Sequence, residues 1–557
     1  MITPAELRSI PLFSKLGDNE LEHLARNVAD IRARPGEYIV NEGESRALFV
    51  TIEGKQEVTK VVEGLERVIG IRNPGELFGE VPMMLNTPFL ASLRALEPSR
   101  VIRIEAKEFH AIAAMAPEIS ATVGAAAFDR LEGLHDIAAQ PPSPELLVIG
   151  PRWDPQCHEL RDFLERNQVP FDWLTPDEPV SAALNIPVGD RYPIVRMQDG
   201  SVLVAPTIRE IAKLVGLCIA PKHVDYDVAI VGGGPAGMAA AVYGASEGLR
   251  TVLIERRAPG GQAGQSSRIE NYLGFPVGIS GEELANRALH QARRFGAEIV
   301  VTRAVETVRT NPLGIALDDG TLLNARNLIL ALGVTWRRLN LENAERLTGR
   351  GVYYGASRSE ASSTQGQDVY LVGAGNSGGQ AALFFANYAN SVTLVCRGET
   401  LEKNMSRYLI DQLDTKSNIH VQLRSEVVAL YGDDHLQAID ILNRDLGTIS
   451  RKPTPALFAF IGADTDTEWL PSDIARDSRG FVLTGADVVK TGKWNLDRDP
   501  FLVETSVPGI FAAGDIRSGS VKRVAAGVGE GSMSIAMVHQ FRQQIESSRP
   551  KNAVAPA

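Results

Sequence analysis

Gly232, Gly234 and Gly237 lie between two apolar segments that are typical of β-strands, and an Ala-rich segment follows them. Gly232 permits a tight turn, Gly234 lets the backbone approach a pyrophosphate, and Gly237 lets a helix pack closely on a strand. A helix that begins here offers N–H donors and a partial positive charge to that pyrophosphate. Glu255 follows Gly232 by about 20 residues, the spacing of an acid that binds a ribose hydroxyl. The pattern predicts a dinucleotide site made by Gly232, Gly234, Pro235, Ala236, Gly237 and Glu255.

A second glycine pattern occurs in GQDVYLVGAGNSGGQ, and the strand expected after it ends in Cys396 and Arg397 rather than in an acid. An arginine removes the repulsion that a carboxylate would exert on a 2′-phosphate, and it can pair with that phosphate. We therefore favour NADPH over NADH, although Gly398 provides no second basic side chain. The alternative is that Arg397 is only a solvated strand end. The expected NADPH residues are Gly373, Gly375, Asn376, Ser377, Gly378 and Arg397.

A third motif, VPGIFAAGDIRSGSVKR, places Gly514 and Asp515 at the end of an apolar strand. An acid in this position can bind the ribityl hydroxyls of a flavin, and the basic residues Lys522 and Arg523 can support negative charge on the reduced ring. The alternative for Asp515 is the cap of a helix.

The composition is that of an ordinary globular protein, with 557 residues of which 44% are hydrophobic and 22% charged. The net charge of −11 argues against nucleic acid and anionic membranes as partners. Cys157, Cys218 and Cys396 are too far apart in sequence for a disulfide framework or a zinc site, so we expect no metal. The segment MITPAELRSIPLF has no long apolar core, and we expect a cytoplasmic protein.

The elements that position these residues fall into three regions. Residues 1–140 predict an α+β domain with a small β-barrel or jelly roll, between helices at 12–29 and 117–138. A Pro-rich linker at 140–144 leads to a compact α/β unit at 145–220. From residue 224, two βαβ patterns predict two Rossmann-like dinucleotide-binding modules, so the fold class is multidomain.

From about 224 to 545 the sequence resembles the low-molecular-weight thioredoxin reductases. The shared landmarks are the two glycine patterns, Gly260-Gly261-Gln262, Glu270-Asn271-Tyr272, Phe460-Ile461-Gly462 and Gly514-Asp515. The resemblance implies a homodimer with an FAD domain at 224–337 and 457–545, an NADPH domain at 338–456 and a flexible tail at 546–557. It implies that domain rotation alternates the redox partners. It also implies a flavin contact for Gly261, Gln262, Asn271, Gly514, Asp515, Lys522, Arg523 and Val524.

The sequence departs from this family at the redox-active CxxC. Gly355-Ala356-Ser357-Arg358 stands in its place, and no cysteine lies between Cys218 and Cys396. A serine hydroxyl does not undergo thiol–disulfide exchange, which excludes thioredoxin reduction through an internal dithiol.

The middle region resembles a thioredoxin or glutaredoxin fold over about 70 residues. Asp154-Pro155-Gln156-Cys157 stands where glutaredoxins carry Cys-Pro-x-Cys, and Tyr192-Pro193 occupies the position of the cis-proline of that fold. Cys157 is a candidate catalytic thiol if the helix N-terminus lowers its pKa. We favour the alternative, a vestigial thiol in a docking module.

The first region resembles cyclic-nucleotide-binding domains through PGEYIVNEGE and FGEVPMMLNTPFLAS. The resemblance implies a pocket that includes Gly79, Glu80, Ala91 and Ser92, with Glu80 on a ribose 2′-hydroxyl. Phe89 stands where the family has its phosphate-binding arginine, and Arg94 is the nearest arginine that follows. We expect the fold without cyclic AMP binding, and either ligand sensing or a dimerisation or partner module.

Three functions remain open. The first is an FAD-dependent oxidoreductase that takes hydride from NADPH and passes electrons to an acceptor other than an internal dithiol, such as a small oxidant, a quinone, an iron–sulfur protein or an external disulfide. The second is a redox-sensing flavoprotein with little turnover. The third is a thioredoxin-type reductase that uses Cys157. We favour the first because both glycine fingerprints are intact.

Overall fold

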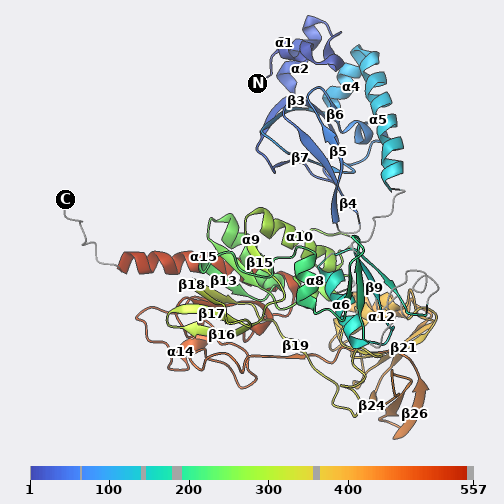
Figure 1. Cartoon of the computed structure of the whole chain (residues 1–557), viewed down its shortest axis with the longest axis vertical. Coiled ribbons are helices and arrows are strands. Elements are labelled where there is room, and N and C mark those ends of the chain that lie inside the picture. Colours follow the sequence, from blue (N-terminus) through green and yellow to red (C-terminus); the bar gives the residue numbers. More distant parts are fainter. Residues whose placement is uncertain are drawn as a thin grey trace. The chain divides into compact units, whose positions relative to one another are not determined.

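The computed structural model describes residues 2–62, 65–138, 146–167, 169–177, 191–266, 268–276, 278–355 and 364–548 (Figure 1). The chain divides into two compact units, Met1–Ser143 and Pro144–Ala557. The linker predicted at 140–144 lies outside the described residues. Each unit is considered by itself below.

The N-terminal unit contains two four-stranded antiparallel sheets, in agreement with the predicted β-barrel or jelly roll. Their orders are β1-β8-β3-β6 and β2-β7-β4-β5. Strands of both sheets contribute to one buried cluster, which includes Phe49, Leu93 and Val101. The strands are β1 (Ala29–Ala33), β2 (Tyr38–Val40), β3 (Ala47–Glu53), β4 (Gln56–Val62), β5 (Leu65–Arg72), β6 (Leu77–Phe78), β7 (Ser92–Ala95) and β8 (Ser99–Glu105).

The helices of this unit correct one prediction and confirm another. Instead of one helix over 12–29, a 3-10 turn and a shorter helix occur, because Pro11 starts a separate 3-10 turn and Gly17 is extended before α2 begins. The last helix has the predicted bounds. The helices are α1 (Pro4–Ser9), η1 (Pro11–Phe13), α2 (Asp18–Asn27), α3 (Glu80–Leu85), α4 (Ala106–Met115) and α5 (Pro117–Ala138).

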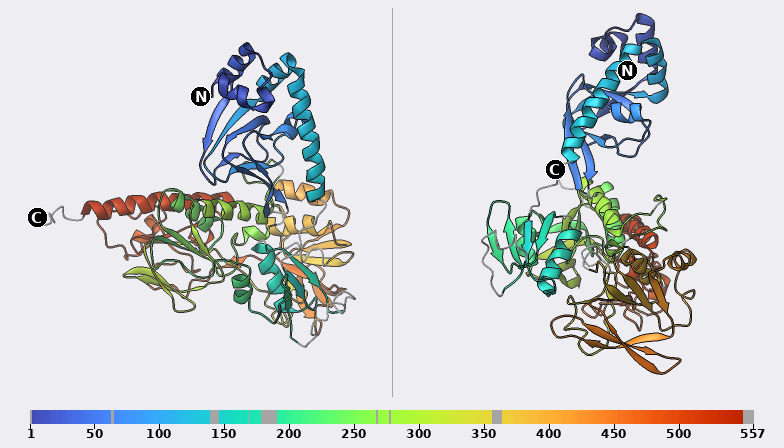
Figure 2. Two further views of the ribbon diagram at one scale, coloured as in Figure 1. Left: turned by 45° about the horizontal axis from the view of Figure 1, so that its top comes forward. Right: turned by 90° about the vertical axis from the view of Figure 1, so that its right-hand side faces the viewer.

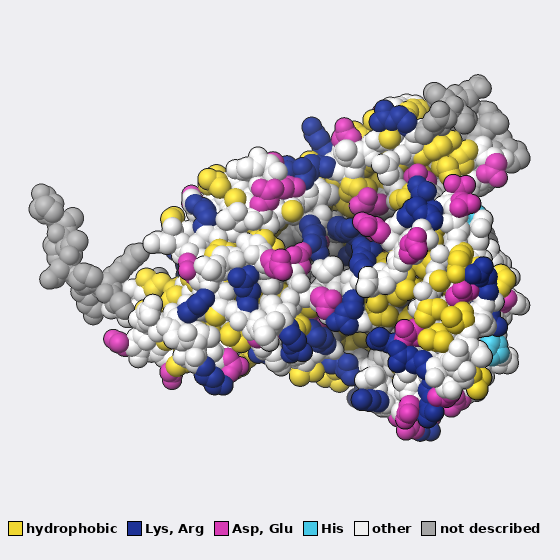
Figure 3. Space-filling model, turned by 90° about the horizontal axis from the view of Figure 1, so that it is seen from below, with side chains coloured by type: hydrophobic (Ala, Val, Ile, Leu, Met, Phe, Trp, Pro, Cys, Tyr) yellow, Lys and Arg dark blue, Asp and Glu magenta, His cyan; other side chains and the backbone are white. Residues whose placement is uncertain are grey.

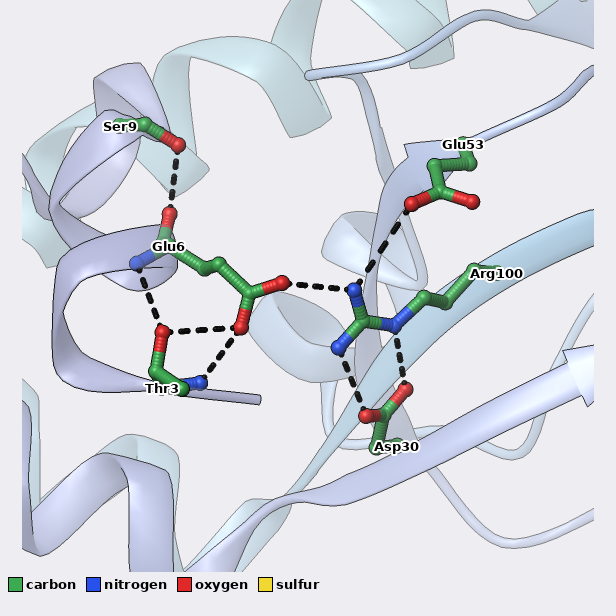
Figure 4. Close-up of polar contacts among 6 residues, drawn as sticks. All are labelled: Thr3, Glu6, Ser9, Asp30, Glu53 and Arg100. Carbon is green, nitrogen blue, oxygen red and sulfur yellow. Dashed lines mark hydrogen bonds and ion pairs between the residues drawn. The ribbon is translucent and has the colours of Figure 1, made fainter. Parts of the chain in front are cut away.

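Arg100 of β8 ties the first helix to the first sheet (Figure 4). Its Nε and Nη2 atoms donate to the Asp30 carboxylate of β1 at 2.9 and 2.8 Å, and its Nη1 donates to Glu6 of α1 at 2.8 Å. Glu6 also closes a capping box with Thr3. The hydrogen bonds from Arg100 lower the pKa of both Asp30 and Glu6 to about 2. Both carboxylates are therefore ionised at neutral pH and hold α1 against β1 and β8.

The middle region forms a four-stranded sheet of order β10-β9-β11-β12, within the predicted bounds of 145–220. β9 is parallel to β10 and antiparallel to β11. The Tyr192–Pro193 peptide bond is cis, as expected. The elements are β9 (Leu146–Ile149), α6 (Pro155–Arg166), β10 (Phe171–Leu174), β11 (Ile194–Met197), β12 (Val202–Val204) and α8 (Ile208–Leu214).

The first dinucleotide-binding module has a seven-stranded sheet of order β15-β14-β13-β18-β17-β16, and β29 pairs in parallel with β18. The strands are β13 (Asp225–Val231), β14 (Thr251–Ile254), β15 (Glu298–Val300), β16 (Val305–Thr310), β17 (Leu313–Leu317), β18 (Leu322–Leu330) and β29 (Ile510–Ala512). Its helices are α9 (Pro235–Ser246), η2 (Ala263–Gln265), α10 (Gly281–Arg294), α14 (Ala486–Val489), η3 (Gly514–Ile516) and α15 (Val524–Ser548). A strand from the C-terminal part of the chain, β29, thus completes this sheet.

The C-terminal helix α15 packs along α9, although the two are far apart in sequence (Figure 2). A Cβ at Gly531 would lie 2.0 Å from the Ala236 carbonyl oxygen, so the two helices approach closely at that glycine. The helix ends at Ser548, which corrects the predicted start of the flexible tail at 546. Residues 549–557 lie outside the described residues.

The second module has a parallel sheet of order β20-β27-β21-β22-β23 and an antiparallel sheet β24-β25-β26. The predicted boundary at 457 is wrong, because Leu457–Ala459 is β27 and pairs with β20 and β21 of this sheet. The chain enters and leaves through the paired strands β19 (Thr335–Trp336) and β28 (Ala463–Asp464). The other elements are β20 (Val352–Tyr353), β21 (Asp368–Val372), α12 (Asn376–Phe385), β22 (Ser391–Val395), α13 (Arg407–Asp414), β23 (Ile419–Gln422), β24 (Ser425–Tyr431), β25 (Ala438–Asn443) and β26 (Thr448–Pro453).

Among the described residues, none of the helices has both the length and the apolar character that a membrane span requires. Figure 3 shows that basic and acidic side chains both occur across the face drawn there, with hydrophobic side chains between them.

Candidate functional site: two glycine cradles

The turn from Gly232 to Gly237, which we call the first glycine cradle, has no room for a side chain at two of its positions. Gly232 has a φ of +104°, and a Cβ there would lie 2.4 Å from the Ala331 carbonyl oxygen. A Cβ at Gly237 would lie 1.9 Å from the Gly232 carbonyl oxygen. Gly234 is the N-cap of α9, and Pro235 is its first residue. Because the glycine cap has no side chain that could accept a hydrogen bond, the first N–H groups of α9 can donate to a ligand.

Glu255 lies beside this cradle at the end of β14, as predicted. Its carboxylate accepts hydrogen bonds from the Gly233 N–H at 2.7 Å and the Arg257 N–H at 2.9 Å. The residue is 9% exposed. Two backbone donors fix the orientation of the carboxylate, and its remaining lone pairs can accept from ribose hydroxyls.

The loop at 260–262 packs on the cradle. The Gly260 N–H donates to the Gly233 carbonyl at 2.7 Å. Gly261 has a φ of +56°, and a Cβ there would lie 2.9 Å from the Gly234 Cα. Gln262 Nε2 donates to the Val334 carbonyl at 2.6 Å. Gly261 thus lies against the backbone of Gly234, and Gln262 is tied to the chain just after β18.

The third motif reaches the same place from the C-terminal part of the chain. The Gly514 N–H donates to the buried Glu530 carboxylate at 2.7 Å, and a Cβ at Gly514 would lie 3.0 Å from the Ala236 Cβ. Burial raises the pKa of the Asp515 carboxyl, and the positive charge of Lys522 offsets only part of this rise. The 3-10 helix η3 begins after Ala513 and has no side-chain cap, so the structure does not support a capping role for Asp515.

The remaining flavin candidates are less closely held. Lys522 Nζ donates to the Asp515 carbonyl at 3.2 Å, and Arg523 is exposed just before α15, which begins at Val524. Asn271 is exposed, and no hydrogen bond joins its side chain to another described residue. The structure therefore brings Gly261, Gln262, Gly514 and Asp515 together beside the first cradle, whereas no hydrogen bond among the described residues joins Asn271 to them.

The second cradle repeats the geometry of the first. Gly373 has a φ of +140°, and a Cβ there would lie 2.3 Å from the Phe460 carbonyl oxygen. A Cβ at Gly378 would lie 3.0 Å from the Gly373 carbonyl oxygen, whereas a Cβ at the N-cap Gly375 would have no atom within 4 Å. This open space at the start of α12 suits a phosphate that approaches the backbone.

The side chains around the second cradle differ in their roles. The Ser406 N–H donates to Asn376 Oδ1 at 2.7 Å, so Asn376 positions the loop before α13. Ser377 is exposed. Arg397 is exposed beyond the end of β22 and forms no ion pair with another described residue. Its guanidinium is available to a ligand phosphate.

Both cradles fit the cofactors that the sequence predicts. The first offers a side-chain-free helix N-terminus and an oriented carboxylate for FAD. The second offers open space at a helix N-terminus and an unpaired arginine for NADPH.

Cys157 lies in the first turn of α6 but does not have the surroundings of a reactive thiol. The Cys157 N–H donates to the Asp154 carboxylate at 2.8 Å, so Asp154 caps the helix. The thiol is 0% exposed, and burial together with the Asp154 charge raises its pKa. The lowered pKa considered from the sequence is not found, because desolvation and a neighbouring carboxylate both disfavour the thiolate.

Gly355, the first residue of the segment expected at the position of the CxxC, lies beside the first module. A Cβ at Gly355 would lie 3.1 Å from Gln265 Oε1 of η2, next to the loop at 260–262. Ala356, Ser357 and Arg358 lie outside the described residues.

The middle region contacts both dinucleotide-binding modules. Trp153 stacks on His435 with ring centroids 5.1 Å apart and planes 7° apart, and the rings of His158 and Tyr353 lie 5.4 Å apart. Arg166 donates to the carbonyls of Ala258 and Gly261, at 3.2 and 3.4 Å. Sequence reasoning missed these contacts because no local pattern marks a pair of residues so far apart in the chain.

The N-terminal unit contains a cavity of about 200 Å³. Glu80 lies in it, 3% exposed, and burial raises the pKa of its carboxyl. The predicted residues Gly79 and Ala91 also line the cavity, but Ser92 does not, and Ser92 Oγ instead accepts from the Glu42 N–H at 2.9 Å. The lining consists of Val58, Ile69, Arg72, Phe78, Gly79, Glu80, Val81, Pro82, Phe89, Leu90, Ala91, Asp129 and Arg130.

Comparisons with known proteins agree with this architecture. Residues 226–531 match the family described as pyridine nucleotide-disulphide oxidoreductase, and residues 30–115 match the cyclic nucleotide-binding domain. Because the first match covers more than half of the sequence, the chain belongs to the pyridine nucleotide-disulphide oxidoreductase family.

Similar proteins include thioredoxin reductase of Listeria innocua, 28% identical over 331 residues that cover 59% of this chain and 98% of that protein. The F subunit of alkyl hydroperoxide reductase from Staphylococcus aureus is 30% identical over 308 residues, which cover 55% of this chain and 57% of that protein. The 34.2 kDa protein in the rubredoxin operon of Clostridium pasteurianum is 28% identical over 316 residues, 57% of this chain and 96% of that protein.

Among solved structures, thioredoxin reductase of T. acidophilum aligns with a TM-score of 0.51 and 27% identity. The alignment covers 58% of this chain and 100% of the T. acidophilum chain. Thioredoxin reductase of Lactococcus lactis aligns with a TM-score of 0.51 and 28% identity, over 57% of this chain and 99% of that one. The chain is accordingly an NAD(P)H-dependent flavoprotein oxidoreductase that uses FAD and NADPH, with an N-terminal cyclic-nucleotide-binding domain.

Proposed function

We propose that this oxidoreductase passes electrons from NADPH through FAD to an acceptor other than an internal dithiol. The observation that carries the proposal is the absence of cysteine between Cys218 and Cys396, in a chain whose two cradles both fit their cofactors. The dithiol of a thioredoxin reductase would have to lie in that interval. An acceptor must therefore reach the flavin directly.

The residues of the chain have binding and positioning roles in this proposal. Gly232, Gly234 and Gly237 admit the FAD pyrophosphate, and Glu255 and Asp515 accept hydrogen bonds from its sugar and ribityl hydroxyls. Gly373, Gly375 and Gly378 admit the NADPH pyrophosphate, and Arg397 pairs with the 2′-phosphate. When bound, NADPH supplies hydride and FAD passes the electrons on. Lys522 and Arg523 supply positive charge next to the flavin edge.

We further propose how the domains divide this work. The FAD domain comprises residues 224–337 and the segment after 462, and the NADPH domain lies between them, with β27 included. The middle region is a thioredoxin-like domain in which Cys157 has lost its partner, and its contacts with both modules support a docking role. As in the family that it resembles, the chain forms a homodimer.

The acceptor belongs to a class that takes electrons without an internal disulfide relay. Small oxidants, quinones, iron–sulfur proteins and external disulfides fit this description. One relative is named for its place in a rubredoxin operon, so rubredoxin belongs among the acceptors to be tested.

Anaerobic reductive titration tests the proposal. A flavin without a dithiol takes one electron pair, so dithionite is expected to bleach the bound FAD fully at about one two-electron equivalent per flavin. NADPH is expected to bleach it rapidly in a stopped-flow instrument. Turnover is then measured with ferricyanide, a quinone, rubredoxin and oxidised thioredoxin.

Two results would contradict the proposal. Uptake of a second electron pair that disappears in Cys157→Ser would reveal a redox-active disulfide that includes Cys157. A flavin spectrum that NADPH leaves unchanged would instead indicate a redox sensor with little turnover.

A further inference from the structure

Arg166, the last residue of α6, directs its side chain from the middle region to the first dinucleotide-binding module. Its Nη2 donates to the carbonyls of Ala258 and Gly261 at 3.2 and 3.4 Å, and the side chain is 12% exposed. Among the described residues these carbonyls are its only hydrogen-bond acceptors, because Nε is buried without one and Asp162 lies 3.7 Å from Nη1. A basic side chain in the last turn of a helix commonly bonds the last carbonyls of that helix. Here the charge serves the neighbouring module instead.

The two carbonyls depend on Arg166 for a hydrogen bond. No backbone N–H in the part of the chain that the structure describes donates to either of them, and Ala258 is fully buried. Gly260 and Gly261 have φ values of +106° and +56°, so two consecutive residues adopt a conformation that belongs to neither a helix nor a strand. Buried carbonyls of such a loop need a donor from elsewhere. Arg166 supplies it and thereby fixes the loop.

The loop that Arg166 holds also contacts the first glycine cradle. The Gly260 N–H donates to the Gly233 carbonyl, and Gly261 lies against the Gly234 backbone. The peptide bond between Gly261 and Gln262 is trans, so the Gln262 N–H points away from the carbonyl oxygen that Arg166 holds. This N–H donates to no acceptor among the described residues. It is therefore a free donor next to the cradle that fits FAD.

We propose that Arg166 is a positioning residue of the FAD site, supplied by the middle region. It holds the Gly261 carbonyl so that the Gln262 N–H donates to the flavin, and its positive charge polarises the peptide and strengthens that donor. Reduction places negative charge on the flavin, so a stronger donor stabilises reduced flavin more than oxidised flavin. The middle region thus raises the flavin potential in addition to its docking role. The inference rests on the FAD site of the proposed function and not on the choice of acceptor.

Arg166→Met, in the full chain with bound FAD, keeps the aliphatic stem and removes the charge. Anaerobic photoreduction beside a dye of known potential is expected to show a shift of about tenfold toward oxidised flavin, which lowers the two-electron potential by about 30 mV. Titration of the apoprotein with FAD, followed by flavin fluorescence, should show about tenfold weaker binding. Arg166→Lys keeps the charge and N–H donors and should restore most of the potential. Lys213→Ala removes an exposed charge from the same region and should change neither quantity.

If Arg166→Met does not fold, Arg166→Gln takes its place, because it keeps an N–H donor and also lacks the charge. Three results would each overturn the proposal: an unchanged potential in the uncharged variant, an equal fall in Lys213→Ala, or a potential in Arg166→Lys as low as in the uncharged variant. Neither measurement needs an electron acceptor. Failure of this proposal therefore leaves the proposed function standing, and failure of the acceptor tests leaves this proposal standing.

Discussion

Cys157 and Arg397 show how the surroundings of a side chain decide its chemistry. Cys157 lies in the first turn of α6, yet desolvation and the Asp154 carboxylate raise its pKa. Arg397 ends a strand like many surface arginines, yet it is exposed beside an open glycine cradle. The same residue type can be reactive in one environment and inert in another, so its type alone does not decide its chemistry.

The burial of the cysteines predicts their reactivity with a thiol reagent. Cys157 and Cys396 are buried, whereas Cys218 is partly exposed. We expect about one thiol per native chain to react rapidly with a disulfide reagent, and all of them after denaturation. Cys218→Ser should abolish the rapid reaction. Rapid labelling of Cys157 in the native protein, located by mass spectrometry, would contradict the burial described above.

Arg397→Ala should distinguish the two nicotinamide cofactors. Loss of a charge-assisted bond to a 2′-phosphate is expected to raise the KM for NADPH about tenfold and to leave the KM for NADH nearly unchanged. Steady-state reduction of ferricyanide measures both values. Lys416→Ala, on an exposed site of the same module, serves as the control. No change in either KM would show that Arg397 is only a solvated strand end, and an equal rise of both would show that it does not recognise the 2′-phosphate.

At the scale of elements, the sequence predicted what depends on local spacing. The two glycine turns, Glu255 at the end of its strand and the bounds of α5 follow from short patterns of residue types. The contact of Gly260 with Gly233 and the pairing of β27 with the second sheet join segments that are distant in sequence. No local pattern encodes them, which is why the boundary at 457 was misplaced.

Helix α6 should be sensitive to acid because of His158. Burial lowers the pKa of His158 to about 4, and the negative charge of Asp162 offsets only part of this fall. The unfolded state, with a pKa near 6.5, binds the proton first, so α6 loses stability as the pH falls from about 6.5 to about 4. Between pH 7 and pH 5 the loss is about 2 kcal/mol.

Hydrogen exchange of the α6 amides at pH 7 and pH 5 measures this loss. His158→Gln should remove most of the dependence, whereas His110→Gln, on the exposed face of α4, should not. The same pH dependence in His158→Gln would assign the effect to another group.

At the scale of the whole molecule, the middle domain connects to both dinucleotide-binding modules. Trp153→Ala removes its stacking on His435 and should weaken protection of the 432–437 loop by about 1 kcal/mol, without loss of FAD. Hydrogen exchange and the flavin absorbance ratio measure the two effects. Leu214→Ala, at a half-exposed position of α8, is the control. Unchanged exchange of that loop in Trp153→Ala would mean that the stacking contributes nothing in solution.

The pairing of β29 with β18 also fixes an order of events during synthesis. The Asn327 side chain donates to the Gly509 carbonyl across a separation of 182 residues. On the ribosome, the strands from Val352 to Ala459 emerge and can pair with one another before Ile510–Ala512 exists. The nascent chain is therefore expected to complete its NADPH-binding half first and to capture flavin only when translation is nearly finished.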